Sequence, residues 1–368
     1  MTGLVAAMRP QARKTPDPRA VLLAEWRALL DSRPTPPRAR DAAETLGVSE
    51  GALAEARRLS GEATALRDPG GPMGLVALLG ALAPLGPLLA LTRNGACVHE
   101  KTGVYAAPTP HGSMAQTLGE IDLRLTPAQW VAAYALVEGS ADRPRRSLQV
   151  FDAHGEAVHK IHATEATDLA AFEALVDAWA DPLAPPHAFT PRPPSRPDAP
   201  DAAIDCEGLM SAWARLEHSH AFAGLLDRFG VGRAQALRLA EGRFARRLRP
   251  EAVEAALCAA SRRGVALMVF VGNRGAVQIH SGPVRRVEPM GPWVNVLDPG
   301  FNLHLRADRL AGVWLVRKPS IRGEIHGIEA FDGDGALIVQ LFGARAPGQP
   351  APPGWRVLVE EVAGEMAC

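Results

Sequence analysis

The chain of 368 residues repeats itself at a constant offset of 180 residues. The segment Ile121–Leu125 (IDLRL) matches Phe301–Leu305 (FNLHL), and Phe151–Gly155 (FDAHG) matches Phe331–Gly335 (FDGDG). The two copies can be aligned from Gly95 onward, at this offset, without a gap. A fixed offset kept over this length indicates two copies of one folding module. This duplication limits the possible fold more than any other feature of the sequence.

A proline-rich segment separates the two copies. Residues 181–205 hold eight prolines and are expected to form an extended linker. We therefore divide the chain into an N-terminal repeat at residues 21–180 and a C-terminal repeat at residues 206–368. Residues 1–20 are expected to form a disordered N-terminal tail.

Each copy runs from helices into strands. The apolar spacing predicts helices over Glu207–Phe229 and Pro250–Arg263, the second of which ends at a glycine. Strands are predicted over residues 265–271, where apolar residues run continuously, and over Phe301–Arg306, where they alternate. A further strand is predicted over Trp355–Val362. Helices followed by antiparallel strands are typical of the α+β class.

Charge and cysteine content exclude several classes of protein. Forty basic residues balance forty acidic ones, so no net field attracts a polyanion. The four cysteines form no CxxC pair, which is typical of a reducing compartment. The longest apolar stretch, Met73–Leu91, is interrupted by Gly and Pro, and the N-terminal apolar piece precedes basic residues, the reverse of a signal peptide. We expect a cytoplasmic protein that is not embedded in a membrane.

One segment suggests a different class of protein. Ala39–Leu59 reads like the first half of a helix-turn-helix, with Ser49 as the N-cap of the second helix. A DNA reader would present Arg, Asn or Gln early in that helix, whereas this chain has Glu50, Gly51, Ala52 and Leu53. A helical hairpin that packs on its own sheet is therefore favoured, and nucleic acid is an unlikely partner.

The familiar catalytic motifs are absent, so the candidate residues come from helix geometry. The chain has no P-loop, no GxSxG elbow and no HExxH pair. In the predicted helix 207–229, His220 continues an apolar stripe formed by Leu209, Trp213 and Leu216. A neutral imidazole in an apolar setting is a good ligand for a soft metal ion or for haem iron. The alternative, a hydrogen-bonded core histidine, fits the same pattern.

Strand geometry adds a second group of candidates. Arg124 and His304 occupy the same repeat position and point away from the apolar face of their strands, into either a functional cavity or solvent. His99 is a possible ligand in the first copy. Four further residues would matter only if the fold gathers them around one anionic ligand: Arg233, Lys318, Gln340 and Arg345.

The whole pattern resembles a known family, the bacterial hemin-degrading factors, also called cytoplasmic hemin transport proteins, of haem-uptake operons. The resemblance covers nearly the whole chain after the first forty residues. It implies an α+β fold in which two similar halves each have a large antiparallel sheet flanked by helices. The segments that carry it are Leu91–Tyr105, Leu118–Leu125, Arg145–Ile161, Met268–Val284, Gly291–Arg306, Trp314–Pro319 and Val339–Pro350.

The resemblance also implies a site for haem b, bound as ferric hemin, in the C-terminal half. His220 matches the position of the iron ligand, and Arg124 matches a distal arginine. The propionate contacts match Arg233, Lys318, Gln340 and Arg345. Phe342 stands where the family often has tyrosine, so one hydrogen bond of that site is missing here.

The function implied by the resemblance is to accept imported haem and to pass it on for degradation and iron acquisition. The implied partners are haem itself, an inner-membrane haem importer, and a haem oxygenase or another haem-receiving protein. An enzymatic alternative is oxidative opening of the porphyrin, with Arg124 as the distal catalytic residue. A weaker alternative is a haem-responsive DNA-binding protein that uses Ala39–Leu59. The sequence leaves open whether the first copy, through His99, binds a second haem.

Overall fold

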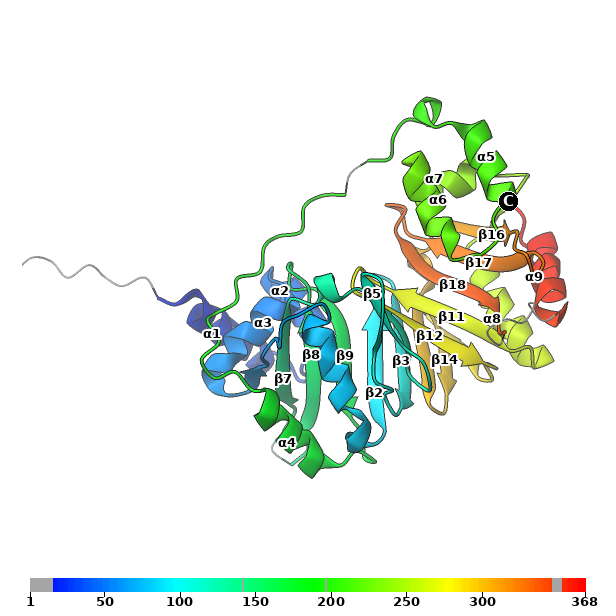
Figure 1. Ribbon diagram of the computed structural model, residues 1–368. Helices are drawn as coiled ribbons and strands as arrows, with labels where there is room; N and C mark the ends of the chain where they lie inside the picture. The colour runs from blue at the N-terminus through cyan, green and yellow to red at the C-terminus, as the bar shows by residue number, and fades with distance from the viewer. Residues whose placement is uncertain (1–15, 141, 196, 346–352) are drawn as a thin grey trace, which may run out of the picture.

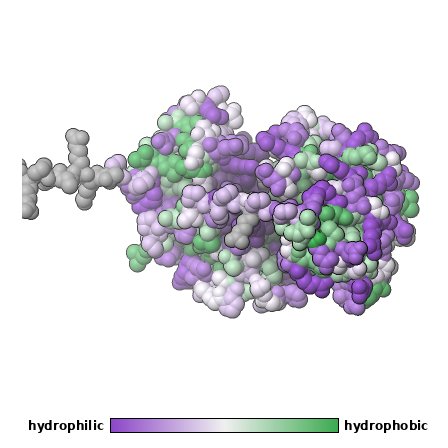
Figure 2. Space-filling view, turned by 90° about the horizontal axis from the view of Figure 1, so that it is seen from above, coloured by the Kyte–Doolittle hydropathy of each residue, from purple (hydrophilic) through white to green (hydrophobic). Residues whose placement is uncertain are grey.

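Two nine-stranded antiparallel sheets form the centre of the molecule. The structure is a computed structural model that describes residues 16–140, 142–195, 197–345 and 353–368. The two sheets lie in two lobes that sit side by side (Figure 1). Viewed from above, the surface is hollowed between the lobes, and hydrophilic residues line much of the hollow (Figure 2).

The sheet of the first lobe, which we call the N-sheet, has the strand order β1-β7-β8-β9-β2-β3-β15-β14-β13. Its strands are β1 (Ala63–Ala65), β7 (Ala132–Glu138), β8 (Arg145–Phe151), β9 (Ala157–Ala163), β2 (Leu88–Arg93), β3 (Cys97–Gly103), β15 (Phe301–Arg306), β14 (Trp293–Asp298) and β13 (Val287–Met290). The second sheet, the C-sheet, has the order β10-β16-β17-β18-β11-β12-β6-β5-β4. Its strands are β10 (Ala245–Leu248), β16 (Gly312–Lys318), β17 (Ile325–Phe331), β18 (Leu337–Gly343), β11 (Leu267–Gly272), β12 (Ala276–Gly282), β6 (Asp122–Leu125), β5 (Met114–Thr117) and β4 (Thr109–His111).

Each sheet takes its last three strands from the other half of the chain. In the N-sheet, β15 pairs with β3, so that Leu303 lies opposite His99. In the C-sheet, β6 pairs with β12, so that Arg124 lies opposite Val277. The duplication and the α+β class are therefore confirmed, but neither repeat builds its sheet alone. Arg124, from the first repeat, belongs to the C-sheet.

Helices cover both faces of the C-sheet. Strand β16 shows this by alternation: Val313 and Leu315 pack with α8 and α9, whereas Trp314 and Val316 pack with α5 to α7. In the part of the chain that the structure describes, no helix is both long and apolar enough to cross a membrane. The α-helices are α1 (Pro18–Asp31), α2 (Ala39–Leu46), α3 (Glu50–Arg57), α4 (Leu169–Trp179), α5 (Cys206–Ala214), α6 (Ala221–Phe229), α7 (Arg233–Leu239), α8 (Ala252–Arg263) and α9 (Pro353–Glu365).

Two predicted elements are wrong. The helix over Glu207–Phe229 is in fact two helices, α5 and α6, and between them the carbonyl of Glu217 accepts a hydrogen bond from the Ile321 amide (3.1 Å). The predicted strand over Trp355–Val362 is part of helix α9. Its buried residues follow the helical spacing of three and four, as the set Trp355, Leu358, Val359, Val362 and Ala363 shows.

The start of helix α3 is buried against the rest of the protein. Ser49 caps α3 as predicted, its hydroxyl accepting from the Ala52 amide at 3.2 Å. Glu50, Gly51 and Leu53 are buried, so the start of α3 is covered by the protein itself. Helix α1 begins at Pro18, within the segment assigned to the tail, whereas residues 1–15 of that tail lie outside the described residues.

The proline-rich linker is anchored to both lobes as it crosses between them (Figure 1). On the N-terminal side, the ring of Phe189 packs against Phe151 and fills the space beside Gly51 and Gly155. On the C-terminal side, the Gln235 side-chain amide donates to the Ala199 carbonyl at 2.6 Å. The linker is therefore held by specific side-chain contacts with both lobes.

The packing of Phe189 against Gly51 and Gly155 gives a stability prediction. A Cβ at Gly51 would lie 2.7 Å from the Phe189 ring and 2.8 Å from the Gly155 Cα atom. We expect Gly51→Ala to lower the free energy of unfolding by about 1–3 kcal/mol through overpacking. The matched control is Gly224→Ala in α6, where a Cβ meets nothing within 4 Å and helix propensity raises stability by up to about 1 kcal/mol. Urea unfolding measures both, and stabilisation of both variants would contradict the packing.

Candidate functional site

One face of the C-sheet carries an apolar surface that remains partly open. Strand register places Met268 opposite Phe342 and Val277 opposite Arg124. Four apolar side chains of this face are half-buried, whereas their neighbours on the other face, such as Val269, are fully buried. We call the set Met268, Phe270, Val277 and Phe342 the apolar floor.

His220 lies near this face at the start of helix α6. His220 is the N-cap residue of α6 and is exposed. The prediction that it continues an apolar stripe along one unbroken helix is therefore wrong. Partial enclosure of the ring lowers its pKa below the ordinary value, and the positive charges of Arg345 and Arg124 lower it further. The imidazole is therefore neutral at neutral pH, with a lone pair available for a metal.

Arg124 reaches the same region from strand β6. Leu123 and Leu125 point into the core, so the side chain of Arg124 points to the open face, as predicted. Its guanidinium donates to the Asp122 carboxylate and to the Leu123 carbonyl, the latter at 3.1 Å. The exchanged strand thus brings a first-repeat arginine close to a second-repeat histidine.

Arg345 completes this group. Its guanidinium donates to the hydroxyl of Ser219, next to His220, at 3.3 Å. Within the described ranges, no carboxylate lies in ion-pair distance of Arg345. Burial lowers the pKa of this guanidinium, and Arg322 adds repulsion. Arg345 is therefore placed to receive an anionic group.

Arg233 and Lys318 meet at a carboxylate that the sequence analysis missed. Glu329 on β17 accepts from Arg233 at 2.7 and 3.0 Å and from Lys318 at 2.6 Å. Burial alone would raise the pKa of Glu329, but the two cations outweigh it and hold that pKa at about 2. The signal was present in the sequence, because Glu329 is the one carboxylate in the otherwise fully buried strand IHGIEAF.

Lys318 lies against two aromatic rings, one of which, Phe342, belongs to the apolar floor. Its ammonium lies 4.4 Å from the ring centre of Phe222 and 5.4 Å from that of Phe342. Burial lowers the pKa of Lys318. Gln340 is half-buried and lies in register between Glu329 and Phe270 on the same face. The predicted site residues thus form two groups, one around His220 and one around Glu329.

The N-sheet presents a different surface at the equivalent place. His162 pairs with Leu89 as Phe342 pairs with Met268, so a polar imidazole replaces an apolar phenyl ring. His304, at the repeat position of Arg124, bonds to Asn295 at 2.7 Å. His99 is fully buried, and neither ring nitrogen has a hydrogen-bond partner among the described residues. The His99 ring is therefore not exposed at the surface of the N-sheet.

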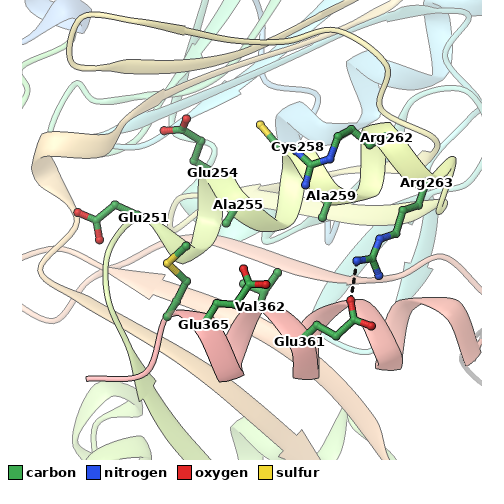
Figure 3. A pocket seen from close by; sticks show the side chains of 11 residues that line it. Glu251, Glu254, Ala255, Cys258, Ala259, Arg262, Arg263, Glu361, Val362 and Glu365 are labelled. Atoms are coloured by element: carbon green, nitrogen blue, oxygen red, sulfur yellow. Dashed lines mark ion pairs between the residues drawn. The ribbon is translucent and has the colours of Figure 1, made fainter.

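The two clefts of note lie away from the apolar floor. One, of about 420 Å³, runs between α8 and α9, where the Arg263–Glu361 ion pair spans it (Figure 3). A second, of similar volume, includes Arg233, Asp198 and Asp334 in its lining. In the described part of the chain, no three His, Cys, Asp or Glu side chains are arranged to hold a metal ion.

Comparison with known proteins identifies the family. The model of the haemin-degrading HemS/ChuX domain matches residues 47–179 and again residues 230–362. The chain belongs to the HemS/ChuX family. The two matches coincide with the duplication, and the second begins after His220, so the family model does not cover that residue.

Similar proteins of the HemS/ChuX family have been characterised. The hemin transport protein HmuS of Yersinia pestis is 36% identical over 326 residues, which are 86% of this chain and 90% of that protein. The structure of holo-PhuS, a heme-binding protein from Pseudomonas aeruginosa, is 45% identical with a TM-score of 0.86, over 93% of this chain and 98% of PhuS. ChuS, a heme degrading enzyme of Escherichia coli O157:H7, is 31% identical with a TM-score of 0.83, over 93% and 99%.

The depressed pKa of Glu329 gives a test by acid. A carboxylate whose folded pKa is about 2, against an ordinary 4.5, contributes stability above pH 4.5 that is lost as the pH falls toward 2. Between pH 5 and pH 3, we expect the wild-type protein to lose about 2 kcal/mol more unfolding free energy than Glu329→Gln. Urea unfolding at both pH values measures this, and equal losses would contradict the ion pairs.

Proposed function

We propose that this protein binds haem b, as ferric hemin, on the open face of the C-sheet and carries it for degradation and iron acquisition. One observation supports this most: the strand exchange brings Arg124 and the neutral imidazole of His220 to one half-buried apolar face. The hemin transport and heme-binding relatives support the choice of ligand.

The residues present fit the chemistry of this ligand. A porphyrin needs an apolar surface, an axial ligand for iron and cations for two carboxylates. The apolar floor supplies the surface, His220 supplies the imidazole, and Arg345 supplies a cation without a carboxylate partner among the described residues. Arg233 and Lys318 fit less simply, because Glu329 already holds both.

The openness of the site suits a carrier. The apolar floor is only half-buried and His220 is exposed, so a bound ligand would keep contact with solvent and with a partner protein. Arg124, opposite, would hold iron-bound water or an anionic iron ligand through its guanidinium donors. We propose that the protein works in the cytoplasm, between an inner-membrane haem importer and a haem oxygenase or another haem-receiving protein.

A hemin titration tests the carrier proposal. The Soret band of wild-type protein should saturate near one hemin per chain. In His220→Ala, we expect an altered Soret band and affinity about tenfold weaker, which is equivalent to about 1.4 kcal/mol. The matched control is His218→Ala, which removes an exposed imidazole two residues away and should leave both unchanged. Identical titrations of wild type and His220→Ala would contradict the assignment of His220.

The second candidate function is oxidative degradation of haem. The description of the relative ChuS as a heme degrading enzyme favours it, and Arg124, whose charge acts on His220, would be its distal catalytic residue. In such a reaction, bound haem would supply the redox chemistry, and the guanidinium of Arg124 would hold the reacting group in place through its N–H donors.

Turnover in the presence of catalase separates the two functions. Catalase removes peroxide, so a ring-opened, biliverdin-like product formed with reductant and oxygen would then come from the protein itself. A pure carrier forms none. If the protein is an enzyme, Arg124→Leu should lose most of the product while it still binds hemin. Product formation that Arg124→Leu leaves unchanged would contradict the catalytic role.

A further inference from the structure

The two halves of the chain carry matching ion-pair clamps of opposite polarity. In the C-terminal half, the first residue of α7 is a cation, Arg233, which binds the buried strand carboxylate of Glu329. In the N-terminal half, the first residue of α3 is an anion, Glu50, which binds the strand cation Lys160 at 3.1 Å and Arg93 at 2.6 Å. Both clamps fix the start of a helix to its sheet.

The clamp of the C-terminal half uses the cations that a ligand carboxylate would need. Glu329 is fully buried and holds both Arg233 and Lys318, which leaves one positive charge in excess. The Arg233 side chain is 27% exposed, whereas the Lys318 side chain is 4% exposed. A carboxylate that approaches from solvent therefore reaches Arg233 first, and it does so in competition with Glu329.

We propose that Glu329 is an internal competitor for the carboxylates of the ligand and thereby sets how tightly a dicarboxylate porphyrin is held. This inference rests on the proposed haem-binding function. When the ligand binds, Arg233 turns one or both of its N–H donors from Glu329 to a ligand carboxylate. When the ligand leaves, Glu329 takes them back.

Competition between Glu329 and the ligand for the N–H donors of Arg233 explains how a cationic site can release its ligand. A guanidinium without a partner would gain a full charge-assisted hydrogen bond from the ligand. A guanidinium that already makes two such bonds, at 2.7 and 3.0 Å, loses nearly what it gains. Glu329 thus lowers affinity for the carboxylates and leaves the apolar and iron contacts unaffected.

Two ligands that differ only in their carboxylates test the proposal. Hemin and hemin dimethyl ester are titrated into wild type and Glu329→Gln, with the Soret band as the readout. We expect Glu329→Gln to bind hemin about tenfold more tightly, equivalent to about 1.4 kcal/mol, and the ester with unchanged affinity. Adding Arg233→Gln to Glu329→Gln should abolish the gain. No change, or an equal change for both ligands, would overturn the proposal.

Two further variants distinguish the proposed competition from an effect of the substitution on folding. Glu50→Gln removes the carboxylate of the N-terminal clamp, and we expect the ratio of hemin affinity to ester affinity to stay at the wild-type value. Glu329→Asp keeps the charge but withdraws it from Arg233, so it should raise that ratio less than Glu329→Gln does. A raised ratio in Glu50→Gln would overturn the proposal. If wild type itself binds neither ligand saturably, the proposed function fails, and not this inference alone.

Discussion

Backbone pairing across the two halves of the chain is the constraint on which the rest of the structure depends. Without exchange, β3 and β12 would each leave a row of unpaired backbone groups at a sheet edge. Three strands from the other half cover each edge, and the new edge strands, β4 and β13, each contain a proline that limits further pairing. The same exchange carries Arg124 to the face where His220 lies, so one site depends on both repeats.

Duplication supplied two similar sheet faces, and side-chain changes made them chemically different. In the C-sheet, Phe342 belongs to an apolar floor, whereas His162 occupies the matching place in the N-sheet. The first residue of the clamped helix has opposite charge in the two halves, Glu50 in one and Arg233 in the other, and the strand partners lie at different places in the two sheets. These differences support our proposal that a porphyrin binds at the C-sheet.

Local patterns allowed much of the fold to be predicted, because they depend on neighbours in sequence. Helix α8 and its glycine cap, the strand Phe301–Arg306 and the duplication were read directly from spacing. Strand exchange could not be predicted, since IDLRL and FNLHL have the same alternation and fit either sheet. The segment between α5 and α6, residues 215–220, contains no glycine or proline, so no local signal marked the break before His220. Glu329 and its two partners, Arg233 and Lys318, lie on three different elements, and only the fold brings them together.

Rescue of His220→Gly by free imidazole tests the central claim most directly. Removing the side chain leaves room for imidazole to occupy the place of the missing ring and to bind iron there. The account predicts that His220→Gly with hemin alone shows an altered Soret band, and that added imidazole restores the wild-type band saturably. A wild-type band in His220→Gly without imidazole would contradict it, because the iron would then take its ligand from elsewhere in the chain.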